Sequence, residues 1–361
     1  MRITLPFYLL LSLLLLTPAA FSQMAAVPPD SSELVTGPAH VLVTPEERAA
    51  AGDLLNRARQ NYFSLHEFRT PYVLKISFNS SGQSRYEGAG TMEEVRLGAR
   101  RWRWTAQIGN ASAGRLIYDG RVYSTSATDT VPLRVYMVRT ALFAPGPAFA
   151  TGQMMRSATV SYKGNEITCL LLSGSVPTDP APRFWVETEY CIDPNSGLLQ
   201  VWSEAPGIYI TYDYSDPLTF HGRTLARQVT FVEDGKTVLD VHLDSLQEPG
   251  EVEPDSLVPT QEMPLSYILS APQRFPIWAD ANAGEGDGNS IHSVIVHATV
   301  DGASGKVLEA EALQNSNPEL AQRALDIVKH SSNSPTGMER EVFINVRFRT
   351  RQQEAAQNSA P

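Results

Sequence analysis

The sequence lacks an excess of basic residues and has no apolar run long enough to cross a membrane. Its 29 Lys and Arg against 39 Asp and Glu give a formal net charge of -10, which disfavours nucleic acid and anionic membrane surfaces as partners. The longest apolar stretch, Leu5 to Leu16, holds about a dozen residues, short of the roughly 20 that a bilayer requires. We therefore expect no stable membrane span.

That apolar stretch has the layout of a secretory signal peptide. Met1-Arg2 precedes it, and Ala20 and Ser22 occupy the two small-residue positions before a cleavage site at Gln23. The alternative is an uncleaved anchor. We predict a signal peptide over residues 1–22 and a periplasmic location, with no lipoprotein processing because no cysteine follows. Residues 23–43, rich in Pro, Ser and Ala, are predicted to be a disordered lead-in.

Only two cysteines occur, Cys169 and Cys191. Export to an oxidising compartment allows them to form a disulfide, which we predict. Two separately buried thiols remain the alternative, because the sequence does not give the Cα separation that a bridge requires.

The region from 44 to 257 predicts one helix followed by an antiparallel sheet. Thr44-Pro45-Glu46-Glu47 is a capping box, and apolar residues then repeat at helical spacing to Leu65. From Tyr72 to about Leu246, short β-branched and aromatic runs alternate with turn sequences such as Asp119-Gly120. The segment 131–155 breaks this rhythm and predicts a short helix or flap. The fold class is α+β, mostly antiparallel β.

A second, smaller unit is predicted near the C-terminus. Residues 258–290 are rich in Pro and Gly, which is typical of a linker. Residues 291–350 then show two alternating apolar runs, a helix that begins at Asn317-Pro318 and a last alternating run, which predicts the order β-β-α-β. Residues 351–361 are predicted to form a disordered tail.

Motifs for a metal site or a bound phosphate are incomplete. His66-Glu67 opens a zinc-protease pattern, but Thr70 stands where the second His is required. His292 and His297 are five residues apart on one predicted strand, so they point to opposite faces. Residues 302–306 contain Gly-Lys without the rest of a phosphate-binding loop. We predict no metal and no cofactor.

The sequence also contains no activated nucleophile. No serine lies in a Gly-x-Ser-x-Gly turn, and neither cysteine has a neighbouring His. Glu187 and Glu189 share a strand face and offer paired carboxylates, although solvated edge residues explain them better. We therefore expect a protein that is not an enzyme, with no catalytic residues.

Cations and aromatics alternate in Arg101-Trp102-Arg103-Trp104. Strand alternation predicts that both Trp side chains point inward and both Arg side chains outward, although stacking on nucleic acid or carbohydrate suits the same pattern. If the interior is hollow, the candidate cavity residues are Trp102, Trp104, Tyr118, Tyr123, Trp185 and Trp202.

The C-terminal unit resembles the C-terminal domain of the TonB family. The resemblance lies in HSVIVHATVDGASGKVLEAEAL from His292, NPELAQRALDIVKH from Asn317 and EVFINVRF from Glu341. It implies docking to another envelope protein by strand addition. The expected edge strand carries Val342, Ile344, Val346 and Phe348.

The region 44–257 is similar in layout to the LolA and LolB lipoprotein-carrier superfamily. The similarity rests on the N-terminal helix, the long hairpins, LIYDGRVY from Leu116 and CIDPNSGLLQVW from Cys191. It implies a half-open barrel with a helical lid and an apolar interior that receives acyl chains.

Together these patterns predict a non-enzymatic periplasmic binding protein. Its half-barrel is expected to hold an apolar ligand, a lipid or a lipoprotein acyl chain, while the TonB-like unit docks to an envelope protein. The alternative is a ligand-free envelope scaffold, or an adaptor of the TonB type. A cavity of several hundred cubic ångströms favours the carrier, and a packed interior favours the scaffold.

Overall fold

The structure, a computed structural model, describes thirteen stretches of the chain. They are residues 39–67, 70–81, 87–125, 131–143, 153–173, 187–205, 208–233, 235–252, 254–266, 274–280, 292–312, 318–333 and 340–349. The predicted signal peptide, most of the predicted lead-in and the predicted tail lie outside them. Within the described residues, no helix is both long enough and apolar enough to span a membrane.

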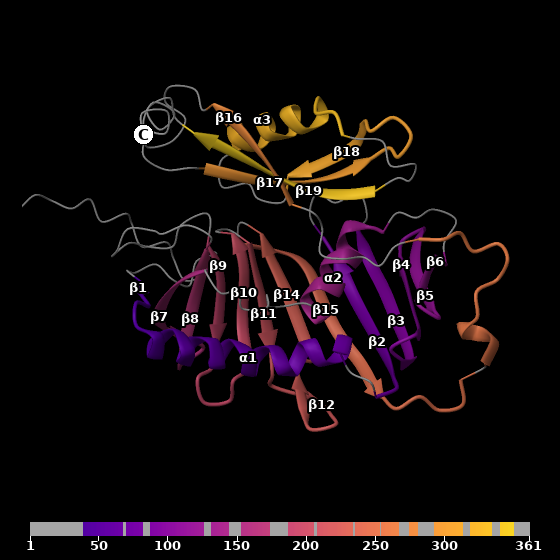
Figure 1. The fold of residues 1–361 in the computed structure, drawn as a ribbon, viewed down its shortest axis with the longest axis horizontal. Coiled ribbons are helices and arrows are strands. Elements are labelled where there is room, and N and C mark those ends of the chain that lie inside the picture. The colour runs from indigo at the N-terminus through magenta and orange to yellow at the C-terminus, as the bar shows by residue number, and fades with distance from the viewer. Residues whose placement is uncertain are drawn as a thin grey trace, which may run out of the picture.

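One large antiparallel sheet dominates the described chain (Figure 1). Its thirteen strands follow in the order β1 (His40–Val41), β7 (Met154–Tyr162), β8 (Asn165–Ser173), β9 (Thr188–Ile192), β10 (Leu199–Ala205), β11 (Ile208–Asp213), β14 (Gln228–Glu233), β15 (Lys236–Gln247), β2 (Tyr72–Ser80), β3 (Gly88–Gly98), β4 (Arg101–Ile108), β5 (Ala111–Tyr118) and β6 (Arg121–Ser124). A separate hairpin consists of β12 (Leu218–Phe220) and β13 (Arg223–Leu225).

The hairpin turns follow from residues that accept a left-handed backbone. Asp119 and Gly120 have φ of 50° and 81°, and Lys163 and Gly164 have φ of 49° and 81°. Two successive positive φ angles give a turn whose twist matches that of the flanking strands. The mostly antiparallel β architecture predicted from the sequence is therefore confirmed.

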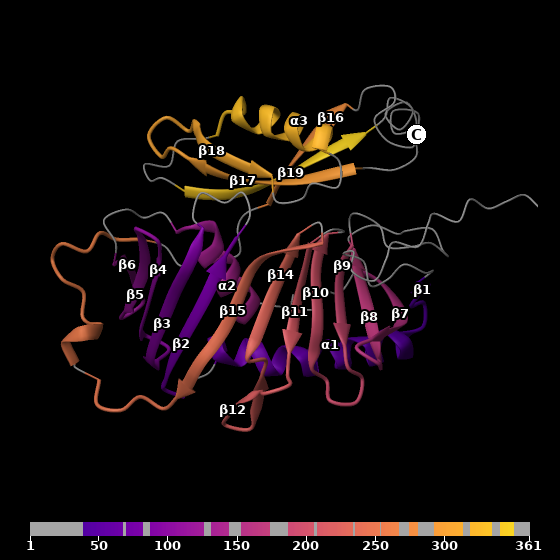
Figure 2. The ribbon, with the colours of Figure 1, turned by 180° about the vertical axis from the view of Figure 1, so that it is seen from behind.

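Helices α1 (Pro45–Glu67) and α2 (Leu133–Phe143) share one apolar core with the large sheet. Figure 1 shows α1 in front of the strands, and Figure 2 shows it behind them, so it covers one face, which we call the inner face. Its first turn has the predicted capping box. The Glu47 N–H donates to Thr44 Oγ1 at 3.2 Å, and the Thr44 N–H donates to Glu47 Oε2 at 3.0 Å.

Both edges of the large sheet are covered by segments that the sequence assigned to irregular chain. At one edge, β1 pairs with β7, so the predicted disordered lead-in is wrong for residues 39–43. At the other, the Ser124 N–H donates to Pro264 O at 2.9 Å and the Ser266 N–H donates to Val122 O at 2.8 Å. The first part of the predicted linker thus pairs with β6, which satisfies backbone groups that an edge strand leaves open.

The residues just before this segment cover the outer face of the sheet. The short 3-10 helix η1 (Pro254–Leu257) places Leu257 against Val95 and Leu116 in a small apolar cluster. Residues 254–266 are therefore fixed on the large sheet, and the predicted linker is wrong for residues 258–266. Its Gly-rich part, residues 283–288, lies outside the described residues.

The C-terminal unit is a four-stranded sheet with one helix. The strand order is β16 (Arg274–Asp280), β19 (Arg340–Arg349), β17 (His292–Val300) and β18 (Val307–Ala312), and α3 (Pro318–Lys329) shares an apolar core with the sheet. The chain order β17-β18-α3-β19 matches the predicted β-β-α-β unit. β16 was not predicted, because its sequence lies in the Pro-rich region.

The position of β16 corrects the predicted partner-binding edge. β16 runs parallel to β19, and Phe275 lies opposite Ile344 in the register. Because β17 pairs with the other side of β19, β19 is an internal strand. The side chains predicted to mark a recruiting edge are buried in the core that the sheet shares with α3: Val342, Ile344, Val346 and Phe348.

Candidate functional site: the inner face of the large sheet

Strand β4 places its two tryptophans on the inner face. Trp102 and Trp104 are 5% and 1% exposed, whereas Arg101 is exposed and Arg103 half-buried on the opposite face. The alternation predicted from Arg101-Trp102-Arg103-Trp104 is confirmed. Because both indoles belong to the core shared with α1 and α2, stacking on an external nucleic acid or sugar is excluded for them.

Two other predicted cavity residues lie on the outer face. In the register of the hairpins, Tyr118 lies opposite Arg101 and Tyr123 opposite Leu116. The Arg101 guanidinium lies 5.2 Å from the ring centre of Tyr118, and Tyr123 packs against the apolar cluster that contains Leu257. Their assignment to a cavity is wrong, because the register puts them on the face away from Trp102. Trp185 lies outside the described residues.

A charged cluster lies among the tryptophans where α2 meets β3 and β4. Arg139 Nη1 donates to Glu94 Oε2 at 2.9 Å, and the Tyr72 hydroxyl donates to Glu94 Oε1 at 2.7 Å. The Arg139 guanidinium also lies 4.4 Å from the ring centre of Trp104. We call Arg139, Glu94, Tyr72 and Trp104 the Arg139 cluster.

The charges of the Arg139 cluster are buried and therefore need compensating partners. The Arg139 and Glu94 side chains are 11% and 2% exposed, so each charge depends on the other for compensation. Burial raises the pKa of Tyr72 well above its usual value, and the adjacent Glu94 charge reinforces the shift. The phenol therefore stays protonated and keeps donating to the carboxylate.

The rest of the inner face carries an apolar row. Six neighbouring strands of the sheet, β8, β9, β10, β11, β14 and β15, each contribute one residue that pairs with the corresponding residue of the next strand. All six side chains are buried in the shared core: Leu170, Tyr190, Trp202, Ile210, Phe231 and Leu239. We call these six residues the apolar row. Of the predicted cavity residues, Trp202 belongs to this row.

Three tyrosines connect the helices to the sheet near the apolar row. The Tyr212 hydroxyl donates to Ala141 O in α2 at 3.0 Å, and the Tyr62 hydroxyl of α1 is hydrogen-bonded to that of Tyr214. The Tyr214 hydroxyl also donates to Leu199 O at 2.9 Å. Burial raises the pKa of all three, so they remain neutral donors at physiological pH.

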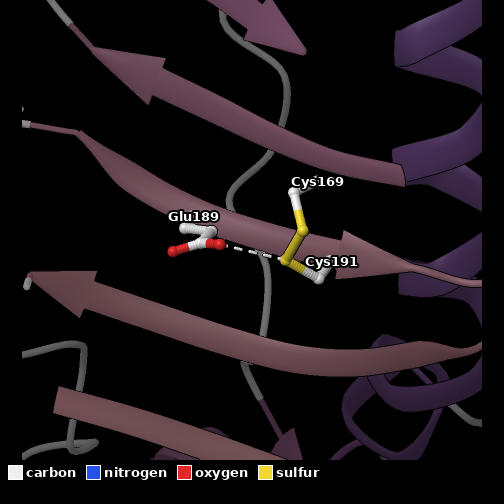
Figure 3. A group of neighbouring side chains, drawn as sticks. All are labelled: Cys169, Glu189 and Cys191. Carbon is white, nitrogen blue, oxygen red and sulfur yellow. Dashed lines mark hydrogen bonds between the residues drawn. A yellow bond between two sulfur atoms is a disulfide. The ribbon is translucent and has the colours of Figure 1, made fainter. Parts of the chain in front are cut away.

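The outer face of β8 and β9 carries the disulfide. Cys169 and Cys191 lie directly opposite each other and are bridged, which confirms the predicted pairing. Figure 3 shows Glu189 beside them, with Oε1 3.1 Å from Cys191 Sγ. The three ligand atoms lie within 4.8 Å of one another, but the bridge occupies both sulfurs, so this group does not offer thiolates to a metal ion.

Glu187 and Glu189 are not solvated edge residues. Both are fully buried, and Glu187 forms a bidentate ion pair with Arg156, at 2.8 Å to Nε and 2.7 Å to Nη2. The sequence interpretation of these carboxylates is therefore wrong. Their burial reflects a covered outer face around the disulfide, which strand alternation alone does not reveal.

A polar groove of about 370 Å³ lies over strands β2 to β5 and the end of β15. Its side chains include a Lys75–Glu93 ion pair at 3.7 Å, with Thr105 and Gln107 beside it. Lys75 and Glu93 occupy outer-face positions, alternating with the buried Ile76 and Met92. This groove does not have the apolar lining expected for an acyl chain.

Comparison with solved structures finds similarity in the larger part of the chain. A LolA superfamily protein of Nitrosomonas europaea is 10% identical with a TM-score of 0.36, covering 58% of this chain and 97% of its own. An outer membrane lipoprotein-sorting protein domain of Vibrio parahaemolyticus is 9% identical with a TM-score of 0.32, covering 58% and 94%. The larger part of the chain is thus similar in structure to these two proteins.

A third similar structure is the complex of MucA and MucB of Pseudomonas aeruginosa. It is 14% identical with a TM-score of 0.26, covering 60% of this chain and 64% of the other. No protein-family profile matches the chain, and no curated protein is similar to it. The resemblance of residues 291–350 to the TonB C-terminal domain stays a prediction.

Proposed function

We propose that this chain is a non-enzymatic periplasmic protein that binds an elongated apolar molecule, the acyl chain of a lipid or lipoprotein, on its inner face. The apolar row carries this proposal. It crosses six adjacent strands, hence five spacings of about 4.8 Å, or about 24 Å of continuous apolar side chains, which are packed in the core shared with the helices in this structure. An extended hydrocarbon matches a surface of this shape, and burial supplies about 25 cal/mol per Å² of apolar area.

The two described helices of the inner face supply the cover of such a site. α2 is held by the Arg139 cluster and by Tyr212, whereas α1 is held by Tyr62 and by Arg57, whose Nη2 donates to Pro194 O at 3.1 Å. These are discrete contacts at identifiable residues. A ligand reaches the row by replacing part of the packing between the helices and the sheet, which requires those contacts to loosen.

Native mass spectrometry of the full chain tests the proposal. The protein is purified from a bacterial envelope with and without organic extraction, and then titrated with a fluorescent fatty acid. We expect a co-purifying lipid that extraction removes, and uptake of one fluorescent fatty acid per chain after extraction. A chain that carries no lipid and takes up no fatty acid contradicts the proposal.

Position-specific controls locate the bound molecule. A bulky substitution in the row, Ile210→Trp, should reduce uptake, because it fills the path between Trp202 and Phe231. Thr105→Trp on the polar outer groove should leave uptake unchanged. Equal effects of the two variants, both shown to be folded by near-ultraviolet circular dichroism, would place the ligand elsewhere.

A scaffold that binds a protein through the C-terminal sheet is the second candidate function. The observation that favours it is the edge strand β18, which pairs only with β17 among the described strands and exposes Leu308 to 53%. A photo-reactive residue at Leu308 should crosslink to an envelope protein, whereas one at Val258, 37% exposed on the large sheet, should not. No crosslink from Leu308 in intact cells would count against this function.

A further inference from the structure

Trp202 brings a buried hydrogen-bond donor into the apolar row. Its side chain is 4% exposed, and its indole Nε1–H meets no acceptor within the described part of the chain. Most buried polar atoms in proteins are satisfied, so an exception calls for a physical explanation. A ligand that supplies an acceptor oxygen provides one.

The neighbours of Trp202 leave the donor in an apolar setting. The Tyr190 ring stacks beside the indole with 6.4 Å between centroids and 8° between planes, and Ile210 lies opposite on the next strand. Both belong to the same buried core as Trp202. A hydrogen bond made in such surroundings is not weakened by competing water, so an acceptor placed there is recognised selectively.

The tryptophans on β4 lack this character. The faces of Trp102 and Trp104 lie near the Arg139 guanidinium, at 6.0 Å and 4.4 Å from the ring centres. Their surroundings are therefore already specialised for holding α2. Among the tryptophans of the inner face that the structure describes, Trp202 is the one that belongs to the apolar row.

We propose that the Trp202 Nε1–H donates a hydrogen bond to the carbonyl oxygen of an acyl ligand, the oxygen of an ester, amide or protonated carboxyl group. This inference rests on the proposed function and names the ligand class: an acylated molecule, as opposed to a plain hydrocarbon. A site that offers a buried donor discriminates against analogues that lack the acceptor, because such analogues leave the donor unpaired.

The place of Trp202 in the row sets the direction of the ligand. Ile210, Phe231 and Leu239 lie on the β15 side, three strand spacings or about 14 Å away at the farthest. Leu170 and Tyr190 lie on the β8 side, two spacings away at most. The carbonyl is therefore placed about two fifths of the way along the row from β8. The acyl chain runs toward β15, and the head group points toward β8.

A matched pair of ligands tests the hydrogen bond. The full chain and its Trp202→Phe variant are titrated with a saturated fatty-acid methyl ester and with the alkane of equal length, each by displacement of a fluorescent fatty acid. The substitution keeps an aromatic ring and removes the five-membered ring of the indole, which carries the donor. We expect the affinity for the ester to fall about fivefold and the affinity for the alkane to stay unchanged.

Trp104→Phe is the control variant on the other part of the inner face. It should change the affinities for ester and alkane by the same factor, since no ligand carbonyl is assigned to that indole. A loss of ester binding in Trp104→Phe as selective as that in Trp202→Phe overturns the inference.

A second measurement is made on the wild-type chain, so the affinity of a variant does not enter it. In the wild-type chain labelled with ¹⁵N at the indole nitrogens, the ester should move the Trp202 indole N–H resonance downfield, and the alkane should not. If both ligands bind but affect the Trp202 indole resonance equally, the hydrogen bond is refuted while the proposed function stands. If neither ligand binds, the proposed function itself fails.

Discussion

The two parts of the inner face are built from the same kind of alternating strand but hold different chemistry. Over β2 to β4, the Arg139 cluster places a buried ion pair and cation–π contacts under α2. Over β8 to β15, the apolar row offers hydrocarbon and aromatic surface with the Trp202 N–H in it. An apolar molecule that replaced the ion pair would leave a buried charge without a partner, whereas it can replace apolar contacts without that cost. In the function that we propose, the first part therefore anchors the cover and the second receives the ligand.

The largest effect is expected from breaking the anchored part. Glu94→Ala removes the partner of the buried Arg139 and the acceptor of Tyr72, so the free energy of unfolding should fall by about 3–5 kcal/mol. Urea denaturation followed by tryptophan fluorescence measures the change. The double variant Glu94→Leu with Arg139→Met should recover most of this loss, because it leaves no uncompensated charge. A loss below about 1 kcal/mol in the single variant would show that the pair does not anchor α2.

A smaller loss of stability is expected from the face of the sheet opposite the apolar row. Replacing Cys169 and Cys191 together by Ala removes a bridge between residues 22 apart in sequence, and stability should fall by about 2–4 kcal/mol. Fatty-acid uptake by the folded protein should persist, because the bridge lies on the face opposite the apolar row. Lost uptake in a folded double variant would contradict this separation of the two faces.

A still smaller loss of stability is expected from disturbing the contact between α1 and the β9–β10 turn. Gly197 has φ of 73°, and a Cβ at this residue would lie 3.0 Å from Cβ of Arg57. Gly197→Ala should therefore cost about 1–2 kcal/mol, from the strained backbone together with displacement of α1. Gly164→Ala is the matched control, with φ of 81° and open space around the added methyl group. Equal thermal denaturation midpoints for the two variants would mean that the turn does not hold α1.

The smallest effect concerns pH at the end of β11. The hydrogen bond from the Ser215 N–H, 2.8 Å from Asp213 Oδ1, lowers the pKa of Asp213, and Lys163 adds to the shift. A lowered folded-state pKa stabilises the protein above the unfolded value of about 3.9, and this contribution disappears as the pH falls through the folded value. Asp213→Asn should therefore lower stability slightly at neutral pH and flatten its decline in acid. Parallel pH profiles of the two proteins would contradict this.

Alternation predicted much of this fold because a strand repeats every two residues. The capping box at Thr44, the helix that it begins and the inward direction of Trp102 and Trp104 all follow from local pattern. Predicting which residues pair across a hairpin is harder, because it requires the strand ends to be known to within one residue. Tyr118 and Tyr123 were placed on the wrong face for that reason, since a shift of one residue reverses every side chain.

Non-local pairing accounts for what the sequence did not reveal. Nothing in the local pattern of residues 274–280 indicates that they pair with β19, so the edge expected at Val342 to Phe348 was wrong. Glu94 was missed although it follows a recognisable pattern: it alternates with Met92 and lies opposite Trp104 in the β3–β4 pairing. The burial of Glu187 depends on Arg156 from a distant strand, a partner that no spacing rule identifies.

The most direct test of the ligand's position is an intermolecular nuclear Overhauser measurement on the ¹⁵N-indole-labelled chain, saturated with a fatty-acid methyl ester. The sequence has five tryptophans, and single Trp→Phe variants assign their indole resonances. Cross-peaks from the Trp202 indole N–H to the ester's chain protons, with none from Trp102 or Trp104, are the predicted result. Cross-peaks confined to Trp102 and Trp104 would place the ligand in the anchored part and contradict the account.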